Sequence, residues 1–243
     1  LVRSSTGDIL FFYLQKNSTT DLKAYVRRST DDAQTWGPPV LIMPEPGYHV
    51  MNNARVIQLT TGRLLAPVAT SPKVGTKNDN FKTVVYRSDD DGRTWQRGTT
   101  FLSAPKRGAM EPGLIELKDG RVLQIIRTQT GKIWHSYSQD GGDTWDIIDH
   151  IFPEADSTQF FGFSGDTYAI HARGNTVALA SFNDFSDSFV MISQDNGDTW
   201  EKQLLVDFPV DMYEVDMGLP EIGEDYNEDG LFQEFFNADG AGD

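Results

Sequence analysis

Acidic side chains are concentrated in four octapeptides: STDDAQTW (29–36), SDDDGRTW (88–95), SQDGGDTW (138–145) and SQDNGDTW (193–200). Carboxylates in a loop can transfer protons or bind a cation. Active sites are rarely built four times on one chain, so the recurrence favours a structural turn. We expect each carboxylate to accept hydrogen bonds from its own turn and each tryptophan to bury its ring. The residues concerned are Asp31, Asp90, Asp140 and Asp195, with Trp36, Trp95, Trp145 and Trp200.

A second group of polar and aromatic residues lies in GYHVMNNARVIQL (47–59). Asparagine and arginine can hold sugar hydroxyls while a tyrosine ring packs against the sugar face. The segment therefore predicts a carbohydrate contact, and the alternative is a single loop bonded to itself. The residues are Tyr48, His49, Asn52, Asn53 and Arg55.

A third candidate site is DYNEDG (225–230), which has the spacing that directs oxygen ligands to Ca²⁺. The ligands would be Asp225, Asn227 and Asp229, but the twelfth position is Phe236 rather than the usual glutamate. Aspartate, asparagine and glycine are also common in plain turns. No other cofactor is expected.

The elements that position these residues form a repeat. The four tryptophans are 59, 50 and 55 residues apart, and each follows two apolar stretches around a glycine turn and a third alternating stretch. Four short strands per repeat predict one blade of an all-β propeller. We expect a single domain, 1–243, with approximate repeats at 1–48, 49–105, 106–158 and 159–212 and a partial repeat at 213–243.

The octapeptides resemble the Asp-box, or bacterial neuraminidase repeat, with the pattern S-x-D-x-G-x-T-W between strands three and four. By this resemblance the chain is identified as a member of the sialidase-like superfamily, which has six four-stranded antiparallel blades. Four blades and the start of a fifth are recognisable here. The first octapeptide has Ala33 where the others have glycine. A left-handed backbone there would cost about 1 kcal/mol.

The resemblance also implies site residues. The stretch from Glu111 to Trp145 is similar to a sialidase segment in which the glutamate polarises a nucleophilic tyrosine and Arg127 grips the substrate carboxylate. Asp21 lies near the position of the family's acid/base aspartate. The family's first arginine would precede residue 1, and its third arginine and tyrosine are not identifiable. The alternatives are a surface glutamate, a sheet-edge arginine and a loop aspartate.

The leading function is therefore a secreted exo-glycoside hydrolase that removes a terminal acidic sugar, sialic acid. The alternatives are a non-catalytic carbohydrate-binding or adhesion propeller and a polysaccharide lyase on the same scaffold. The net charge of −15 argues against a nucleic-acid partner, and no long apolar run predicts a membrane span. The first residues lack the pattern of a signal peptide, and with this function we expect an extracellular or periplasmic location. There is no cysteine.

The calcium hypothesis predicts a metal-dependent melting temperature. Residues 151–243 carry 20 acidic residues against Arg173 and Lys202, a net charge of −18, so a bound cation would relieve repulsion. A ligand that binds only the folded form adds about 2.7 kcal/mol of stability at a hundredfold excess over Kd. Millimolar Ca²⁺ should raise the melting temperature, and Mg²⁺ should raise it less. Identical melts in Ca²⁺ and in chelator would contradict the hypothesis.

Overall fold

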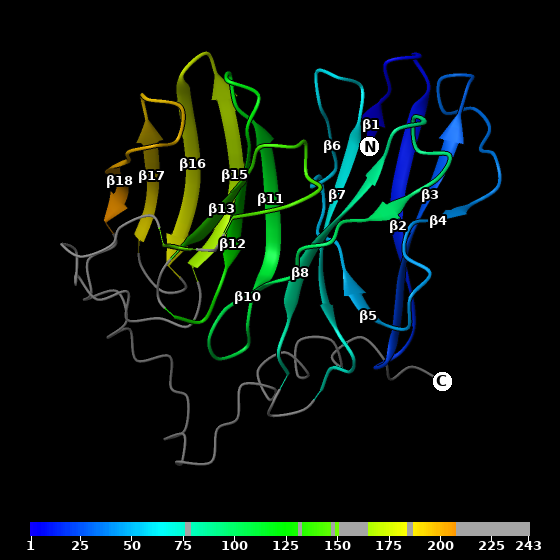
Figure 1. Ribbon diagram of the computed structural model, residues 1–243, viewed down its shortest axis with the longest axis horizontal. Coiled ribbons are helices and arrows are strands. Elements are labelled where there is room, and N and C mark those ends of the chain that lie inside the picture. Colours follow the sequence, from blue (N-terminus) through cyan, green and yellow to red (C-terminus); the bar gives the residue numbers. More distant parts are fainter. Residues whose placement is uncertain (76–78, 131–132, 147–148, 151–164, 184–186, 208–243) are drawn as a thin grey trace, which may run out of the picture. The chain divides into compact units, whose positions relative to one another are not determined.

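The computed structural model describes residues 1–207 except 76–78, 131–132, 147–148, 151–164 and 184–186 (Figure 1). Every regular element in these ranges is a β-strand, which confirms the all-β prediction. The predicted fifth repeat and the calcium ligands Asp225, Asn227 and Asp229 lie outside the described residues. The predicted domain boundaries and the six-bladed count stay predictions. Among the described residues there is no helix of the length and apolarity needed to cross a bilayer.

The strands form four consecutive groups, which we call sheets one to four. Sheet one contains β1 (Val2–Arg3), β2 (Ile9–Ser18), β3 (Asp21–Ser29) and β4 (Val40–Leu41). Sheet two contains β5 (Gly47–Val50), β6 (Ile57–Gln58), β7 (Leu64–Ser71), β8 (Lys82–Ser88), β9 (Gln96–Arg97) and β10 (Leu102–Ser103). Sheet three contains β11 (Met110–Glu116), β12 (Val122–Arg127), β13 (Trp134–Ser138) and β14 (Asp149–His150). Sheet four contains β15 (Gly165–Arg173), β16 (Thr176–Asn183), β17 (Asp187–Ser193) and β18 (Glu201–Asp207).

Sheets one and two are not separate, contrary to a simple succession of independent blades. A short parallel pairing of β3 with β5 joins them, with Asp21 opposite Gly47 and Leu22 opposite Tyr48. All other pairings within the sheets are antiparallel. Between β5 and β6, the six residues 51–56 stand opposite only residues 66–68 of β7, so the first strand of sheet two is interrupted by a wide bulge.

The core lies between successive sheets, because the middle strands are apolar on both faces. In β7, Leu64, Ala66 and Val68 pack toward sheet one, while Leu65 packs with Val122 of sheet three. A third cluster joins sheets three and four through residues such as Leu123, Ile125, Leu179 and Met191. Strand alternation thus places sheets two and three each between two neighbouring sheets of the described residues.

Each octapeptide folds into a turn that is closed by its own serine, aspartate and threonine. In the third, Ser138 Oγ accepts a hydrogen bond from the Gly142 amide at 2.8 Å and donates to Asp140 at 2.8 Å. The Thr144 amide donates to Asp140 Oδ1 at 2.9 Å, and the Thr144 hydroxyl donates to Oδ2. The other three octapeptides repeat the serine–aspartate–threonine bonding. These carboxylates are therefore occupied inside the turn.

Those hydrogen bonds also set the ionisation of the aspartates. Hydrogen bonds from Thr35 and then Ser29 lower the pKa of Asp31 to about 2, and Thr199 does the same for Asp195. Partial burial opposes the shift for Asp140, but the bonds from Thr144 and Ser138 outweigh it and lower its pKa. A lowered pKa in the folded state means that this stabilisation is present above the aspartate's ordinary pKa and is lost as the pH falls through the lowered value.

The turn glycine of an octapeptide packs against the preceding sheet. A Cβ added to Gly142 would lie 2.9 Å from Leu65 Cδ2, and one added to Gly197 would lie 3.6 Å from Leu123. Gly92 similarly approaches Leu10. The tryptophans enter the same interfaces: Trp95, Trp145 and Trp200 each pack in the core between their own sheet and the preceding one. The octapeptides are thus the points where neighbouring sheets meet.

Arginine side chains reinforce this contact from the preceding sheet. Arg63 donates to the Gly141 carbonyl at 3.1 Å, and Arg121 donates to the Asn196 carbonyl at 3.3 Å. Both arginines follow the hairpin glycine of their sheet.

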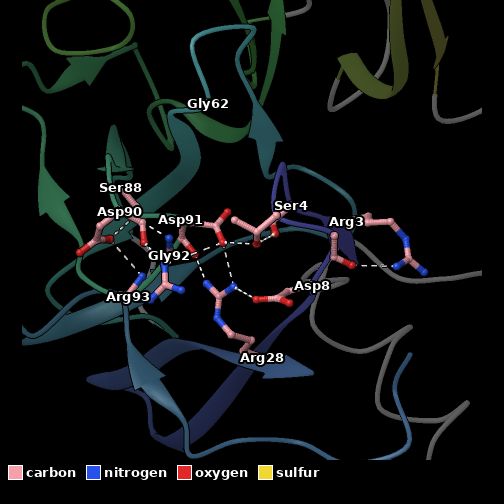
Figure 2. Close-up of polar contacts among 12 residues, drawn as sticks. Arg3, Ser4, Asp8, Arg28, Gly62, Ser88, Asp90, Asp91, Gly92 and Arg93 are labelled. Carbon is pink, nitrogen blue, oxygen red and sulfur yellow. Dashed lines mark hydrogen bonds and ion pairs between the residues drawn. The ribbon is translucent and has the colours of Figure 1, made fainter. Parts of the chain in front are cut away.

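In sheet one this hairpin position holds Asp8 instead of arginine, and Arg28 of β3 supplies the cation. Figure 2 shows Arg28 between Asp8, at 2.5 Å, and Asp91 of the second octapeptide, at 2.8 Å. Arg28 also donates to the Asp91 carbonyl. The guanidinium contact with the octapeptide is therefore kept although its sequence position differs.

Replacing Asp140 with alanine should remove the acceptor that closes the third octapeptide. We expect a loss of about 1 to 2 kcal/mol in the free energy of unfolding at pH 7. The loss should shrink as the pH falls below 4, because the carboxylate of the natural protein then becomes protonated. Urea unfolding of both proteins at several pH values measures this. A large loss of ligand binding at unchanged stability would contradict the structural role.

Replacing Ala33 with glycine should stabilise the protein. Ala33 has φ 67°, a left-handed conformation that favours glycine, and its side chain is exposed. We expect a gain of up to about 1 kcal/mol in thermal or urea unfolding. The reciprocal change Gly142→Ala, where φ is 91° and Leu65 is in contact, should destabilise by more than this. An unchanged or lower stability of Ala33→Gly would show that this backbone conformation carries no cost.

Candidate functional site

The pairing of β11 with β12 brings Glu111 and Arg127 together. Met110 is opposite Arg127, and an extra residue in β11 between Met110 and Gly113 forms a β-bulge. Arg127 Nη1 donates to Glu111 Oε1 at 2.6 Å. Both side chains are about a quarter exposed, at 24% and 29%. A guanidinium and a carboxylate are thus held together where a ligand can still reach them.

Glu111 has an unusual backbone conformation. Its φ is 44°, in the left-handed region that a glutamate seldom adopts. Such a conformation costs of order 1 kcal/mol or more and persists only where the surroundings enforce it. Here the bulge and the bond to Arg127 enforce it. In this backbone conformation the Glu111 carboxylate lies against Arg127 at the end of β12.

Glu111 and Arg127 lie at the end of sheet three that is remote from its octapeptide. Ser138, the first residue of that octapeptide, pairs with Val122 at the start of β12, whereas Arg127 ends the strand. β11 contacts both β7 and β15, the strands of the neighbouring sheets (Figure 1). Asp21 occupies the corresponding end of sheet one. It begins β3, and the other end of β3, Ser29, is the first residue of octapeptide one. Glu111 and Arg127 therefore lie at the end of sheet three opposite the octapeptide.

Arg55 and Asn53 reach sheet three from the bulge of sheet two. Arg55 Nη1 lies 2.8 Å from the point where Gly113 would carry a Cβ, two residues beyond Glu111. Asn53 and Arg55 line two hollows, one of about 540 Å³ beside β2 and one of about 410 Å³ beside β11 and Ile170. Asn52 lines only the first. The structure thus brings Arg55 next to the strand that carries Glu111.

His49 does not join this surface, although the sequence grouped it there. Its side chain is buried, with Nε2 bonded to the Glu45 carbonyl at 3.0 Å and Nδ1 bonded to the Thr70 hydroxyl at 2.9 Å. Burial lowers the pKa of His49, which favours the neutral ring. Its position on β5 turns it inward because neighbouring residues of a strand alternate between faces. His49 is a structural histidine in this fold.

Tyr48 and Asp21 lie beside each other at the β3–β5 pairing. Tyr48 packs on the core that includes Phe81 and Met110, with the Lys16 ammonium 5.7 Å from its ring centroid. Asp21 accepts a hydrogen bond from the Asn17 amide at 2.9 Å. Neither residue lines the hollows beside Arg55. The β5–β6 bulge therefore separates Tyr48 from Asn53 and Arg55, with which the sequence analysis grouped it.

A larger hollow, of about 790 Å³, lies at the octapeptide end, but its charged groups are bonded within the protein. Asp90 is bonded to Thr94, Arg63 is paired with Asp89 at 2.6 Å, and Glu116 accepts from Thr60. No cluster of metal-ligating side chains occurs among the described residues. The end with Glu111, Arg127 and Arg55 is therefore the stronger candidate site.

Gly113 is the member of this group that the sequence interpretation missed. A glycine inside the apolar stretch of β11 is a signal of a bulge or of close approach by another group. Both features occur here, since the bulge ends at Gly113 and Arg55 lies over it.

Comparison with known proteins identifies the family. Residues 1–211 match the BNR repeat-like domain. A sialidase from Micromonospora viridifaciens is 31% identical over 196 residues, which are 74% of this chain and 29% of that protein. The chain thus spans less than a third of this curated relative.

Solved structures show the same fold. The NanB sialidase from Streptococcus pneumoniae has a TM-score of 0.55 and 21% identity, covering 77% of this chain and 29% of that one. An α-L-arabinanase from Penicillium chrysogenum has a TM-score of 0.55 and 16% identity, covering 84% and 65%. With the four octapeptides and the four-stranded sheets, these matches show that the chain belongs to the BNR repeat-like family and has the fold of the sialidase-like proteins.

Proposed function

We propose that this chain carries part of the active site of a secreted glycoside hydrolase that removes terminal sialic acid. The observation that carries the proposal is the Arg127–Glu111 pair, held at 2.6 Å on the end of sheet three opposite the octapeptides. Arginine matches a carboxylate with two parallel donors, and sialic acid is a sugar with a carboxylate. The sialidase relative supports this choice of sugar. The arabinanase, which was solved with arabinobiose, shows that the same fold also occurs in an enzyme for a different sugar.

In the proposed reaction, Arg127 binds the substrate carboxylate and Arg55 adds a second cation. Glu111 accepts the proton of a tyrosine, whose oxygen forms a covalent glycosyl intermediate as the glycosidic bond breaks, and Asp21 protonates the leaving oxygen. Water, deprotonated by Asp21, then cleaves the intermediate, and the proton returns from Glu111 to the tyrosine. Asp21 lies at the same end of its sheet as Glu111 does in sheet three. Asn53 and Asn52 offer amide groups to sugar hydroxyls from the hollows beside Arg55.

A carbohydrate-binding protein without hydrolysis is the second candidate. One observation favours it: Arg127 already occupies one oxygen of the Glu111 carboxylate, which leaves that group less free to activate a tyrosine. Binding of sialylated glycans without turnover would select this candidate.

Replacing Arg127 with lysine tests the proposed function. In the full-length protein, kcat/KM for a fluorogenic sialoside should fall about 10- to 100-fold, because lysine keeps the charge but loses the paired donors. Arg121→Lys is the matched control: Arg121 directly precedes β12, is equally exposed at 23%, and is also paired with an acid, Asp119, at 2.7 Å.

The control should lower the melting temperature through the octapeptide contact but leave kcat/KM within about twofold. A glycan array on the same proteins separates hydrolysis from binding. Equal activity of the Arg127→Lys and Arg121→Lys proteins would contradict the assignment of Arg127. If the natural protein neither hydrolyses nor binds any sialoside, the proposal is wrong.

A further inference from the structure

His49 lies at the parallel pairing of β3 with β5 that joins sheets one and two. β5 is four residues long and meets β3 through two residue pairs. On its other side β5 pairs with β7, where His49 stands opposite Thr70. The His49 side chain is 3% exposed, so the ring is enclosed at a narrow connection between two sheets.

Both ring nitrogens of His49 are bonded to neighbouring elements. Nε2 lies 3.0 Å from the Glu45 carbonyl, which can only accept a hydrogen bond, so Nε2 carries a proton. Nδ1 lies 2.9 Å from the Thr70 hydroxyl, and in the neutral ring Nδ1 accepts the hydroxyl proton. The ring also lies over Gly47, where a Cβ would be 3.1 Å from Cε1 and 3.2 Å from Nε2. The neutral ring therefore fits this site with both nitrogens bonded.

Protonation of His49 would place a positive charge beside the ammonium of Lys23. Lys23 of β3 donates to the same Glu45 carbonyl that accepts from His49. Two cations on one carbonyl oxygen repel each other, and a buried site screens them less than water does. The uncharged Thr70 hydroxyl of β7 would also have to turn, because a protonated Nδ1 donates and can no longer accept.

Two carboxylates near His49 act in the opposite direction. Asp21, which begins β3, and Glu45, which precedes β5, both attract an imidazolium. The Glu45 carboxylate is engaged elsewhere, since it accepts from the Tyr86 hydroxyl of β8 at 2.7 Å and lies 3.4 Å from Arg97 of β9. Burial has the largest effect on His49, and its pKa is consequently below the ordinary histidine value.

We propose that His49 is an acid-sensitive lock on the junction of sheets one and two. At neutral pH the uncharged ring ties β5 to the Glu45 carbonyl and to β7, and at mildly acidic pH its protonation releases β5 from β3. The segment 51–56, which carries Asn53 and Arg55, follows β5 directly and loosens in the same step. This inference goes beyond the proposed function, because it does not depend on which sugar the protein binds.

The lock gives the folding stability a defined pH dependence. Because the pKa of His49 is lowered in the folded state, its contribution is complete above the ordinary histidine pKa of about 6.5. The contribution is lost as the pH falls from there toward the lowered value, since the unfolded chain binds the proton first. Over that interval the unfolding equilibrium constant rises by up to about tenfold per pH unit. The octapeptide aspartates, whose pKa values are lowered, stay ionised in this range.

Urea unfolding of the full chain at several pH values, compared with His49→Gln, is the first test. Glutamine keeps an amide donor for the Glu45 carbonyl but does not titrate. Between pH 7 and pH 5 the unfolding constant of the natural protein should rise about tenfold more than that of the variant. His171→Gln is the matched control, because His171 is exposed on β15, and it should keep the pH dependence of the natural protein. Equal pH dependence of the natural and His49→Gln proteins would overturn the inference.

Hydrogen exchange of the natural protein tests the lock even if His49→Gln does not fold. After correction for the intrinsic pH dependence of exchange, the amides of residues 47–56 should lose about tenfold of their protection between pH 7 and pH 5. The amides of β12, in the middle of sheet three, should keep theirs. Unchanged protection of residues 47–56, or the same loss in β12, would show that acid does not release β5.

Discussion

The close packing of each octapeptide on the preceding sheet is the contact that organises the described part of this protein. A side chain at Gly142 would collide with Leu65, so the glycine is needed for the third sheet to approach the second. The aspartate holds the turn in the shape that exposes the glycine, and the tryptophan fills the space beside it. Octapeptide one has Ala33 in place of this glycine, and the Ala33 side chain is exposed.

The two ends of the sheets consequently use charge in different ways. At the octapeptide end, arginines and aspartates are bonded to each other and to carbonyl groups, as Arg28 is with Asp8 and Asp91. At the other end, Arg127 is paired with Glu111 of its own sheet, and it is about as exposed as the arginines at the octapeptide end. The Arg28–Asp91 pair connects two sheets, whereas the Arg127–Glu111 pair lies within one sheet.

The sequence was sufficient for the features that depend on local pattern. Glycine turns, apolar alternation and the repeated tryptophans predicted the strands of all four sheets, and the resemblance to sialidases singled out Glu111 and Arg127 without predicting that they form an ion pair. Three features could not be predicted, because they depend on register. His49 pairs within β5 and faces the interior, β3 pairs with β5 in parallel, and Arg55 crosses to Gly113 from the segment between β5 and β6. Periodicity gives the face of a regular strand but fails where six residues stand opposite three.

The central claim is that the end of β11 and β12 binds a sugar carboxylate, and a crystal structure of the full-length protein with an unsaturated sialic acid analogue tests it most directly. The account predicts the carboxylate oxygens within about 3 Å of Arg127, with Arg55 as a further donor. An analogue bound with its carboxylate away from both arginines, or bound only in the hollow at the octapeptide end, would contradict it.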